Sequence, residues 1–348
     1  MALKIMGEML HVQPLEEMGL HQVDHQDRYS LLSYLKSCGK QKDLHKTINI
    51  HSQILQKKLF LKDVYVNTAL ISAYSKCGAL AEAQQVFNQL PIQNVVSWTA
   101  LISGYAHHGL GNEAIDRFRQ MRDEGIPPNS VTFISILKAC SSIGLVCGCR
   151  EIHASINRIG LQNDIVIGNA LVDTYAKCGL LEEAQVTFNT LVVQDIISWT
   201  TLITGYAQLG KIENAIWTFK KMLTKGMKPN AITFSSILNC CCHGGLVDEG
   251  EVCFRAMCSH WQLVPTIEHY TSMVDLFGRA DHVDKGVSVI MTMPFHPSIV
   301  MWHTVLGTCQ RSGAAEVAKY AFGHSMELDE YDSASYIYMS NTYANSVE

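Results

Sequence analysis

The sequence is poor in charge and contains no long apolar segment. Charged residues make up 17% of its 348 residues and hydrophobic residues 47%, so the chain can form a buried core and is not mainly disordered. A run of about eighteen apolar residues, the length that crosses a bilayer, does not occur, which argues against a membrane-spanning helix. A glycine-rich phosphate loop and a G-x-S-x-G string are also missing from the sequence. We therefore expect no enzymatic activity and no cofactor.

Basic residues are scarce as well. Lys and Arg number 27 against 32 Asp and Glu, which gives a net charge of −5 and a pI near 6.3. Polyanion-binding proteins usually carry a basic footprint, so this balance is a caution against such a partner, although local clustering on one face is still open. The first 28 residues contain only Lys4 and Arg28 as basic residues against five acidic ones, unlike an organellar transit peptide. We expect a targeting segment to lie upstream of this chain or to be absent.

A long internal repeat is the dominant feature that is present. SWTALISGYA at 97–106 returns as SWTTLITGYA at 198–207, which is 101 residues later. ALISAYSKCG at 69–78 and ALVDTYAKCG at 170–179 show the same shift. A fixed long period indicates a repeat array, which acts through a row of equivalent surface positions rather than through one catalytic pocket.

Apolar spacing within the period predicts pairs of helices. In the segment 95–129, Leu101 and Tyr105 belong to the apolar face of a first helix. A second helix carries a stripe with helical spacing, formed by Ala114, Ile115, Phe118 and Met121. Gly125 is expected to end this second helix. Each pair of helices must stack on its neighbours because it cannot bury its apolar face alone.

The period divides into hairpins of 31, 35 and 35 residues, and the same phase extends in both directions. We expect an all-α, right-handed superhelical solenoid of antiparallel helix-turn-helix repeats. The predicted organisation is an N-terminal remnant at 1–27, an array over 28–298 and two less regular hairpins over 299–348. The units of the array are 28–63, 64–94, 95–129, 130–164, 165–195, 196–230, 231–266 and 267–298.

The twelve cysteines favour packing over a metal site or disulfides. Cys77 and Cys178 are one period apart, and so are Cys140 and Cys241, so they occupy equivalent positions where a small apolar side chain packs. The adjacent residues 240–243 (Cys-Cys-Cys-His) have poor spacing for chelation. We expect no metal and a reducing intracellular or organellar compartment.

The alternation of 31, 35 and 35 resembles the pentatricopeptide repeat family of plants, specifically its PLS subfamily. Residues 95–129 resemble the P unit, VTFISILKACSSIGLVCGCREIHASI the L unit and VIGNALVDTYAKCGLLEEAQVTFNTL the S unit. Residues 231–266 and 267–298 resemble the final L and S units. IVMWHTVLGTCQRSG resembles the first E motif, and SASYIYMSNTYANS the start of a second one that stops at Glu348. Cys149 and Asp281 stand where relatives commonly have glycine, which hints at a divergent copy.

The resemblance implies a single-stranded RNA partner, read at one base per helical repeat by two side chains. In the resembled family these are the fifth and the last residue of each unit. The implied order of bases over 64–230 is A, A, unassigned, U and A, running 5′ to 3′ along the chain. The implied base-reading pairs are Thr68 with Asn94, Thr99 with Asn129, Asn169 with Asp195, and Thr200 with Asn230. For the pair Ser235 and Thr266, the family's pattern gives only a loose base assignment.

Two further sets of residues complete the implied site. The second residue of each unit is expected to flank a base, and here it is apolar: Tyr65, Val96, Val131, Val166, Ile197 and Ile232. Lys76, Lys177 and Arg279 occupy equivalent places near the end of a first helix and are candidates for phosphate contacts. Few such contacts imply a shallow salt dependence.

Structural roles compete with each of these assignments. Asn94, Asn129, Asp195 and Asn230 precede helices, where such residues cap free backbone N–H groups. The three basic residues fit a solvated helix C-terminus equally well, because the helix dipole favours cations there. His51 and His153, at matched positions of two L units, are expected to pack rather than to act in catalysis.

Many members of the subfamily end in a deaminase-like domain that needs an H-x-E and a C-x-x-C zinc site, and neither string occurs here. The leading hypothesis is a sequence-specific RNA-binding protein of mitochondria or chloroplasts, with mitochondria slightly favoured, that recognises C-to-U editing sites. Its E region would recruit a deaminase-bearing partner or another editing factor. The alternatives are RNA stability, processing or splicing without editing, a helical protein–protein scaffold, and a truncated copy without function.

Overall fold

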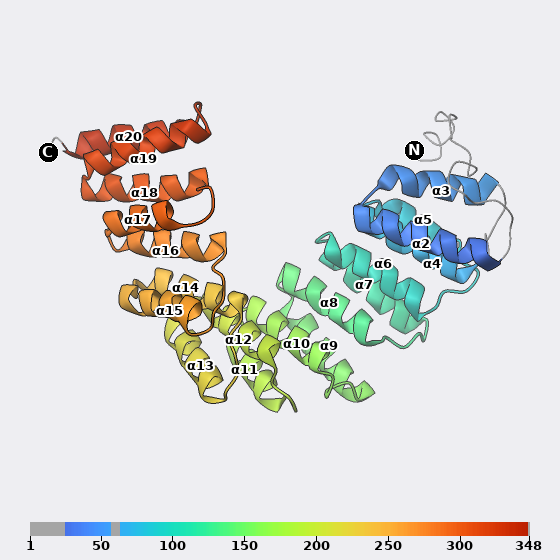
Figure 1. The fold of residues 1–348 in the computed structure, drawn as a ribbon. Helices are drawn as coiled ribbons and strands as arrows, with labels where there is room; N and C mark the ends of the chain where they lie inside the picture. The colour runs from blue at the N-terminus through green and yellow to red at the C-terminus, as the bar shows by residue number, and fades with distance from the viewer. Residues whose placement is uncertain (1–24, 57–62, 347–348) are drawn as a thin grey trace. The chain divides into compact units, whose positions relative to one another are not determined.

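The computed structural model describes residues 25–56 and 63–346, and their regular structure consists of helices alone (Figure 1). The remnant expected at 1–27 lies mainly outside these residues. The last two residues of the expected second E motif, 347–348, also lie outside them. The helices are α2 (His25–Gln41), α3 (Leu44–Gln56), α4 (Val64–Cys77), α5 (Leu80–Asn88), α6 (Val95–His107), α7 (Gly111–Asp123), α8 (Ser130–Ile143), α9 (Val146–Ile159), α10 (Ile165–Lys177), α11 (Leu181–Thr190), α12 (Ile196–Gln208), α13 (Ile212–Thr224), α14 (Ala231–Gly244), α15 (Val247–Ser259), α16 (Ile267–Arg279), α17 (Val283–Thr292), α18 (Ile299–Ser312), α19 (Ala315–Leu328) and α20 (Ser333–Ser346).

The chain forms two compact units, Met1–Cys178 and Gly179–Glu348. Within each unit the even-numbered helices, here called the first helices, pack on one another in chain order. The odd-numbered helices, the second helices, pack against the first helix that follows them and, with the exception of α11, against the first helix of their own hairpin. The predicted all-α array of stacked antiparallel hairpins is therefore confirmed (Figure 1).

The first helices begin where a polar residue caps them. Asn94 accepts hydrogen bonds from the backbone N–H groups of Val96 and Ser97, and Asp63 does the same for the start of α4. The described first helices α4 to α18 start at residues 64, 95, 130, 165, 196, 231, 267 and 299, the residues that open the units delineated from the sequence. The naming of those units as P, L, S and E motifs stays a prediction.

The turn after most first helices needs a left-handed backbone. Gly144, for example, caps α8 with φ at 66°, a conformation that glycine adopts without steric cost. After α16 the same place is taken by Asp281 with φ at 59°. The residue that departs from the family pattern thus sits in a strained backbone conformation.

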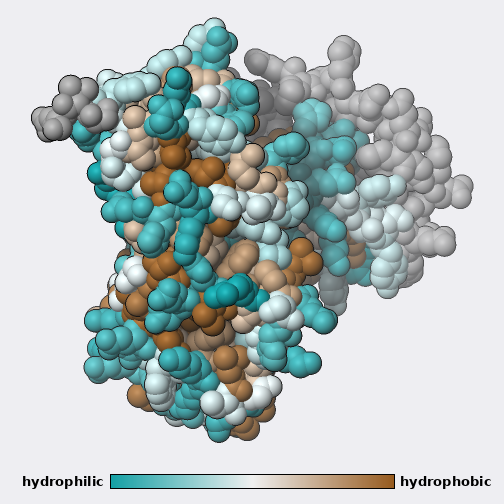
Figure 2. All heavy atoms as spheres, turned by 60° about the vertical axis from the view of Figure 1, so that its left-hand side comes forward, coloured by the Kyte–Doolittle hydropathy of each residue, from teal (hydrophilic) through white to brown (hydrophobic). Residues whose placement is uncertain are grey.

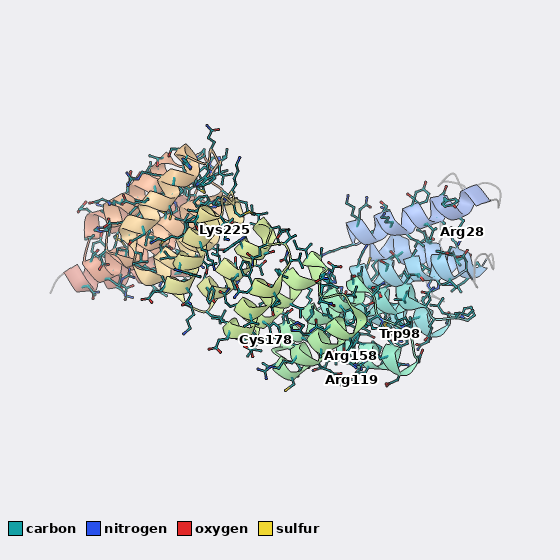
Figure 3. All side chains as sticks on the ribbon, turned by 90° about the horizontal axis from the view of Figure 1, so that it is seen from below. Arg28, Trp98, Arg119, Arg158, Cys178 and Lys225 are labelled. Atoms are coloured by element: carbon teal, nitrogen blue, oxygen red, sulfur yellow. The ribbon has the colours of Figure 1, made fainter. Side chains whose placement is uncertain are left out.

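Aromatic pairs repeat across the hairpin interfaces. Trp98, labelled in Figure 3, is fully buried and meets the ring of Phe87 edge-on with centroids 4.6 Å apart. One period later, Trp199 and Phe188 repeat this arrangement at 4.8 Å. The sequence echo therefore corresponds to a repeated packing geometry.

Most cysteines pack in the interior, but Cys77 and Cys178 are only partly buried and Cys147 and Cys258 are exposed. Cys140 and Cys241 are buried, and so are their neighbours Cys240 and Cys242. Burial raises the pKa of the Cys240 thiol to about 11, which keeps it protonated and unreactive. Among the described residues no group of His, Cys, Asp and Glu is arranged to hold a metal ion. Over the same part of the chain, every helix is too short or too polar to cross a membrane.

Candidate functional site

The apolar second residues of the units are exposed at the start of the first helices. In the first compact unit, Met1–Cys178, the side chain of Tyr65 is 70% exposed and that of Val96 is 55% exposed. In the second, Gly179–Glu348, the side chain of Ile197 is 57% exposed and that of Ile232 is 63% exposed. Figure 2 shows apolar side chains among hydrophilic ones on the face that it draws. Exposed apolar residues at one recurring helical position fit a contact surface better than core packing.

The last residues of the units are N-caps, as the capping interpretation required. The Oδ1 atoms of Asn129 and Asn230 each accept a hydrogen bond of 2.9 Å from a backbone N–H, those of Thr132 and Thr233. Asp195 accepts from the backbone N–H of Ser198 at 2.8 Å. Because a backbone N–H can only donate, the accepting atom in each asparagine is the oxygen, and its Nδ2 amide is left as a hydrogen-bond donor.

The fifth residues lie at the edge of the core. Thr99 and Thr200 are each 7% exposed, and Asn169 is 8% exposed. Thr68 is half-buried, and its hydroxyl oxygen is itself shielded from solvent and has no hydrogen-bond partner within the described residues. Only a group that comes close to the start of a first helix can therefore reach these side chains.

A third side chain joins the fifth and the last residue in two of the units. The Thr132 hydroxyl lies 2.6 Å from that of Thr99 and donates to Oδ1 of Asn129 at 2.9 Å. One period later, the Thr233 hydroxyl lies 2.7 Å from that of Thr200 and donates to Oδ1 of Asn230 at 2.9 Å. We call this connection, made by the third residue of the following unit, the side-chain bridge.

A histidine forms a side-chain bridge in unit 231–266. His269 Nδ1 accepts from the backbone N–H of Thr266 at 2.9 Å and lies 2.8 Å from the Thr266 hydroxyl. Its Nε2 lies 3.1 Å from the Ser235 hydroxyl and 2.9 Å from the carbonyl oxygen of Ala231. Since Nδ1 accepts a backbone N–H, the ring proton belongs on Nε2.

Unit 64–94 has the same Thr and Asn pair without a bridge. There the Ser97 hydroxyl donates to the backbone carbonyl of Asn94 at 2.9 Å. The structure therefore separates units that look alike in sequence. Sequence reasoning missed Thr132, Thr233 and His269, although a Ser, Thr or His three residues after each cap gave a capping-box signal for them.

The candidate phosphate contacts are exposed at the ends of first helices. Lys177 pairs with Asp173 at 2.7 Å, and Arg279 pairs with Asp275 at 3.0 Å, each about half-exposed. Lys76 is exposed at the same place in α4. Arg311 takes this place in α18, where sequence reasoning missed it, and its Nη2 donates to the carbonyl oxygen of Gly278 at 2.7 Å. Arg279 and Arg311 line one open pocket with His303 and Tyr338.

Other exposed arginines lie elsewhere. Arg119 and Arg158, labelled in Figure 3, are carried by the second helices α7 and α9. They do not share the first helices with the polar pairs. These two arginines are therefore not placed to follow a strand along the first helices.

Family models match more than half of the chain. The model described as PPR repeat family matches residues 93–142 and 194–243. The model described as PPR repeat matches residues 68–94, 169–195, 232–261 and 268–295. These segments hold most of the hairpins described above.

Relatives from Arabidopsis thaliana match along nearly the whole chain. The pentatricopeptide repeat-containing protein CRR2, chloroplastic, is 36% identical over 326 residues, covering 92% of this chain and 50% of its own length. The pentatricopeptide repeat-containing protein At2g03880, mitochondrial, is 34% identical over 318 residues, covering 91% and 50%. The chain spans about half the length of the curated relatives that it matches.

A solved structure shows the same fold. The pentatricopeptide repeat protein PPR10 in complex with an 18-nt psaJ RNA element aligns with a TM-score of 0.68 at 21% identity, covering 86% of this chain and 45% of that one. Hairpin architecture, repeat matches and relatives agree, and the chain belongs to the pentatricopeptide repeat family.

Proposed function

We propose that the chain binds single-stranded RNA along the starts of its first helices, at one base per repeat. The observation that carries this proposal is the recurrence of one constellation: an exposed apolar second residue, a polar fifth residue and a capping last residue whose amide is still available to donate. Capping and base reading use different atoms of the same asparagine. The cap therefore orients the amide instead of consuming it.

The structural neighbour supports the choice of ligand, because PPR10 was solved with an RNA element on the same fold. By the family's pattern the chain reads A, A, an unassigned base, U and A with units 64–94 to 196–230. The apolar second residues flank the bases and the exposed cations meet phosphates. Base stacking on an aromatic side chain is worth about 1–3 kcal/mol, and aliphatic flanking gives less, so affinity accumulates over many units.

Binding to short RNAs tests the proposal. Fluorescence anisotropy should show tighter binding to a labelled strand containing A-A-N-U-A than to a strand in which A and U are exchanged. Equal binding to both strands would refute the base assignment. Absence of binding to either strand at moderate salt would favour a protein–protein scaffold instead.

The finer proposal is recognition of C-to-U editing sites in an organelle, with a deaminase supplied by a partner that contacts residues 299–348. The resemblance of these residues to E motifs supports it, and α18 and α19 form a hairpin on which α20 packs, a surface that such a partner can contact. The names of two relatives, one chloroplastic and one mitochondrial, support an organellar location. Pull-down of a deaminase-bearing protein that depends on residues 299–348 would test the partner.

A further inference from the structure

We propose that the side-chain bridge sets which base each bridged unit prefers, by fixing whether the fifth residue accepts or donates a hydrogen bond. Thr132, Thr233 and His269 are then positioning residues that need not touch RNA themselves. This inference rests on the proposed function, because it concerns the base that faces each unit.

The direction of the hydrogen bonds follows from the capping geometry. Oδ1 of Asn129 accepts the backbone N–H of Thr132 and also the Thr132 hydroxyl proton. With its own proton used there, the Thr132 hydroxyl can only accept from Thr99 across their 2.6 Å contact. The Thr99 oxygen is thereby left as an acceptor, and Nδ2 of Asn129 as a donor. The bonds of Thr200, Thr233 and Asn230 run the same way.

An acceptor beside a donor matches adenine. The Watson–Crick edge of adenine offers an amino donor at N6 and an acceptor at N1. Inosine carries an oxygen at C6 and a proton on N1. It therefore has an acceptor where adenine has a donor and a donor where adenine has an acceptor, in nearly the same shape. A unit whose fifth residue is locked as an acceptor should therefore discriminate between these two bases.

The histidine bridge orients the hydrogen bonds of unit 231–266 in the opposite direction. The Nε2 proton of His269 is directed at the Ser235 hydroxyl and the Ala231 carbonyl oxygen, while the Thr266 hydroxyl faces Nδ1. The Ser235 oxygen shares the ring proton with the Ala231 carbonyl oxygen, so the hydroxyl proton of Ser235 is left to donate. The single lone pair of Nδ1 is shared by the backbone N–H and the hydroxyl proton of Thr266, and the Thr266 oxygen is left as an acceptor. Unit 231–266 thus presents the reverse polarity and should favour inosine or guanine over adenine.

The unbridged unit supplies a control within the same chain. Thr68 has no hydrogen-bond partner in the described structure, and Ser97 is engaged with the Asn94 backbone. The Thr68 hydroxyl can rotate to donate or to accept. Unit 64–94 should therefore discriminate weakly between adenine and inosine, although its Thr and Asn pair equals that of unit 95–129.

An inosine scan of the bound RNA tests the inference with the unmodified protein. Six-base strands would carry adenosine or inosine at the first, second, fifth or sixth base, the bases facing units 64–94, 95–129, 196–230 and 231–266. One oriented hydrogen bond corresponds to a change of about three- to tenfold. Inosine should weaken binding by this factor at the second and fifth bases, change it little at the first, and strengthen it at the sixth. The same inosine effect at all four bases would overturn the inference.

Substitution of the bridge then separates positioning from stability. In Thr132→Val the preference for adenosine should fall to near unity at the second base and stay intact at the fifth. Thr132→Ser should restore the preference for adenosine at the second base. In Thr233→Val the preference should be lost at the fifth base and stay intact at the second. A purely structural role would weaken binding to every strand alike, and that outcome would overturn the inference. If no strand binds even the unmodified protein, the proposed function itself fails.

Discussion

Nδ1 of His153 lies 2.9 Å from the hydroxyl of Tyr175, joining α9 to the next first helix, α10. His51 and Tyr74 make the same 2.9 Å contact between α3 and α4. Both histidines are neutral partners, because burial lowers the pKa of His51 and of His153 below the ordinary value of 6.5. The same polar contact thus connects unit 28–63 to unit 64–94 and unit 130–164 to unit 165–195.

These two histidines should make stability depend on pH. Their pKa is lower in the folded than in the unfolded chain, so the unfolded chain binds more protons between the two values. Stability is complete above about pH 6.5 and falls as the pH drops from there to the folded-state pKa, by at most about 1.4 kcal/mol per pH unit for each histidine. Urea unfolding midpoints measured between pH 8 and pH 5 should show this fall.

The matched variants are His51→Gln and His153→Gln, which keep a polar group but do not titrate. The doubly substituted chain should show a flatter pH profile than the unmodified chain. An equally steep profile in both would contradict the assignment of the pH dependence to these residues.

The turn after α16 offers a stabilising substitution. Asp281 has φ at 59° where most of the corresponding turns have glycine, and a left-handed backbone costs a residue with a Cβ about 1–2 kcal/mol. Asp281→Gly should raise the free energy of unfolding by about 0.5–1 kcal/mol, since glycine also gains freedom in the unfolded chain. Thermal or urea unfolding would measure the gain.

Gly144→Ala is the matched reverse change. Gly144 has φ at 66°, and a Cβ added there would meet nothing within 4 Å. The loss of stability should therefore come from backbone strain alone, at about 1 kcal/mol. A gain from Gly144→Ala, or a loss from Asp281→Gly, would contradict this account of the turns.

The sequence predicted the hairpins well because their signals are local. Asn94 and Asn129 mark helix starts through caps, and Gly144 marks a helix end through its backbone freedom. The 101-residue echo corresponded to repeated contacts such as that of Trp98 with Phe87. Periodicity, capping and turn chemistry are readable without tertiary information.

The candidate site was only partly readable. The contact of Thr99 with Thr132 crosses from one hairpin to the next, and the direction of its hydrogen bonds depends on which atom the cap occupies. Unit 64–94 shows the limit, because Ser97 could bridge by sequence but turns to the backbone of Asn94. Side-chain rotation of this kind is decided by packing, so the base-reading assignment itself stays a prediction.

Few phosphate contacts should give a shallow dependence of RNA affinity on salt. Each phosphate contact in a single strand contributes about 0.7 to the slope of log affinity against log salt. Lys76→Gln, Lys177→Gln and Arg279→Gln should each reduce that slope by up to this amount, and so should Arg311→Gln. Affinities measured at several salt concentrations would give the slopes.

Lys319→Gln is the charge-matched control for Arg311→Gln, because Lys319 is exposed on the second helix α19. Its slope should equal that of the unmodified chain. If Lys319→Gln lowers the slope as much as Arg311→Gln does, the effect comes from net charge and not from a contact along the first helices.

A paired substitution should change the base that one unit prefers. Thr200→Asn with Asn230→Asp recreates the pair of unit 165–195, for which the family's pattern gives uracil. The cap should survive, because Oδ1 of aspartate can still accept from the Thr233 backbone N–H as that of Asp195 does from Ser198. Preference at the fifth base should move from adenine to uracil by about fivefold, the worth of roughly one hydrogen bond, while the preferences at the other bases stay unchanged.

The same exchange at Thr99 and Asn129 should change the preference at the second base instead. A shift at a neighbouring base would show that the units are assigned one step out of place, and loss of binding to every strand would show that the pair serves folding alone.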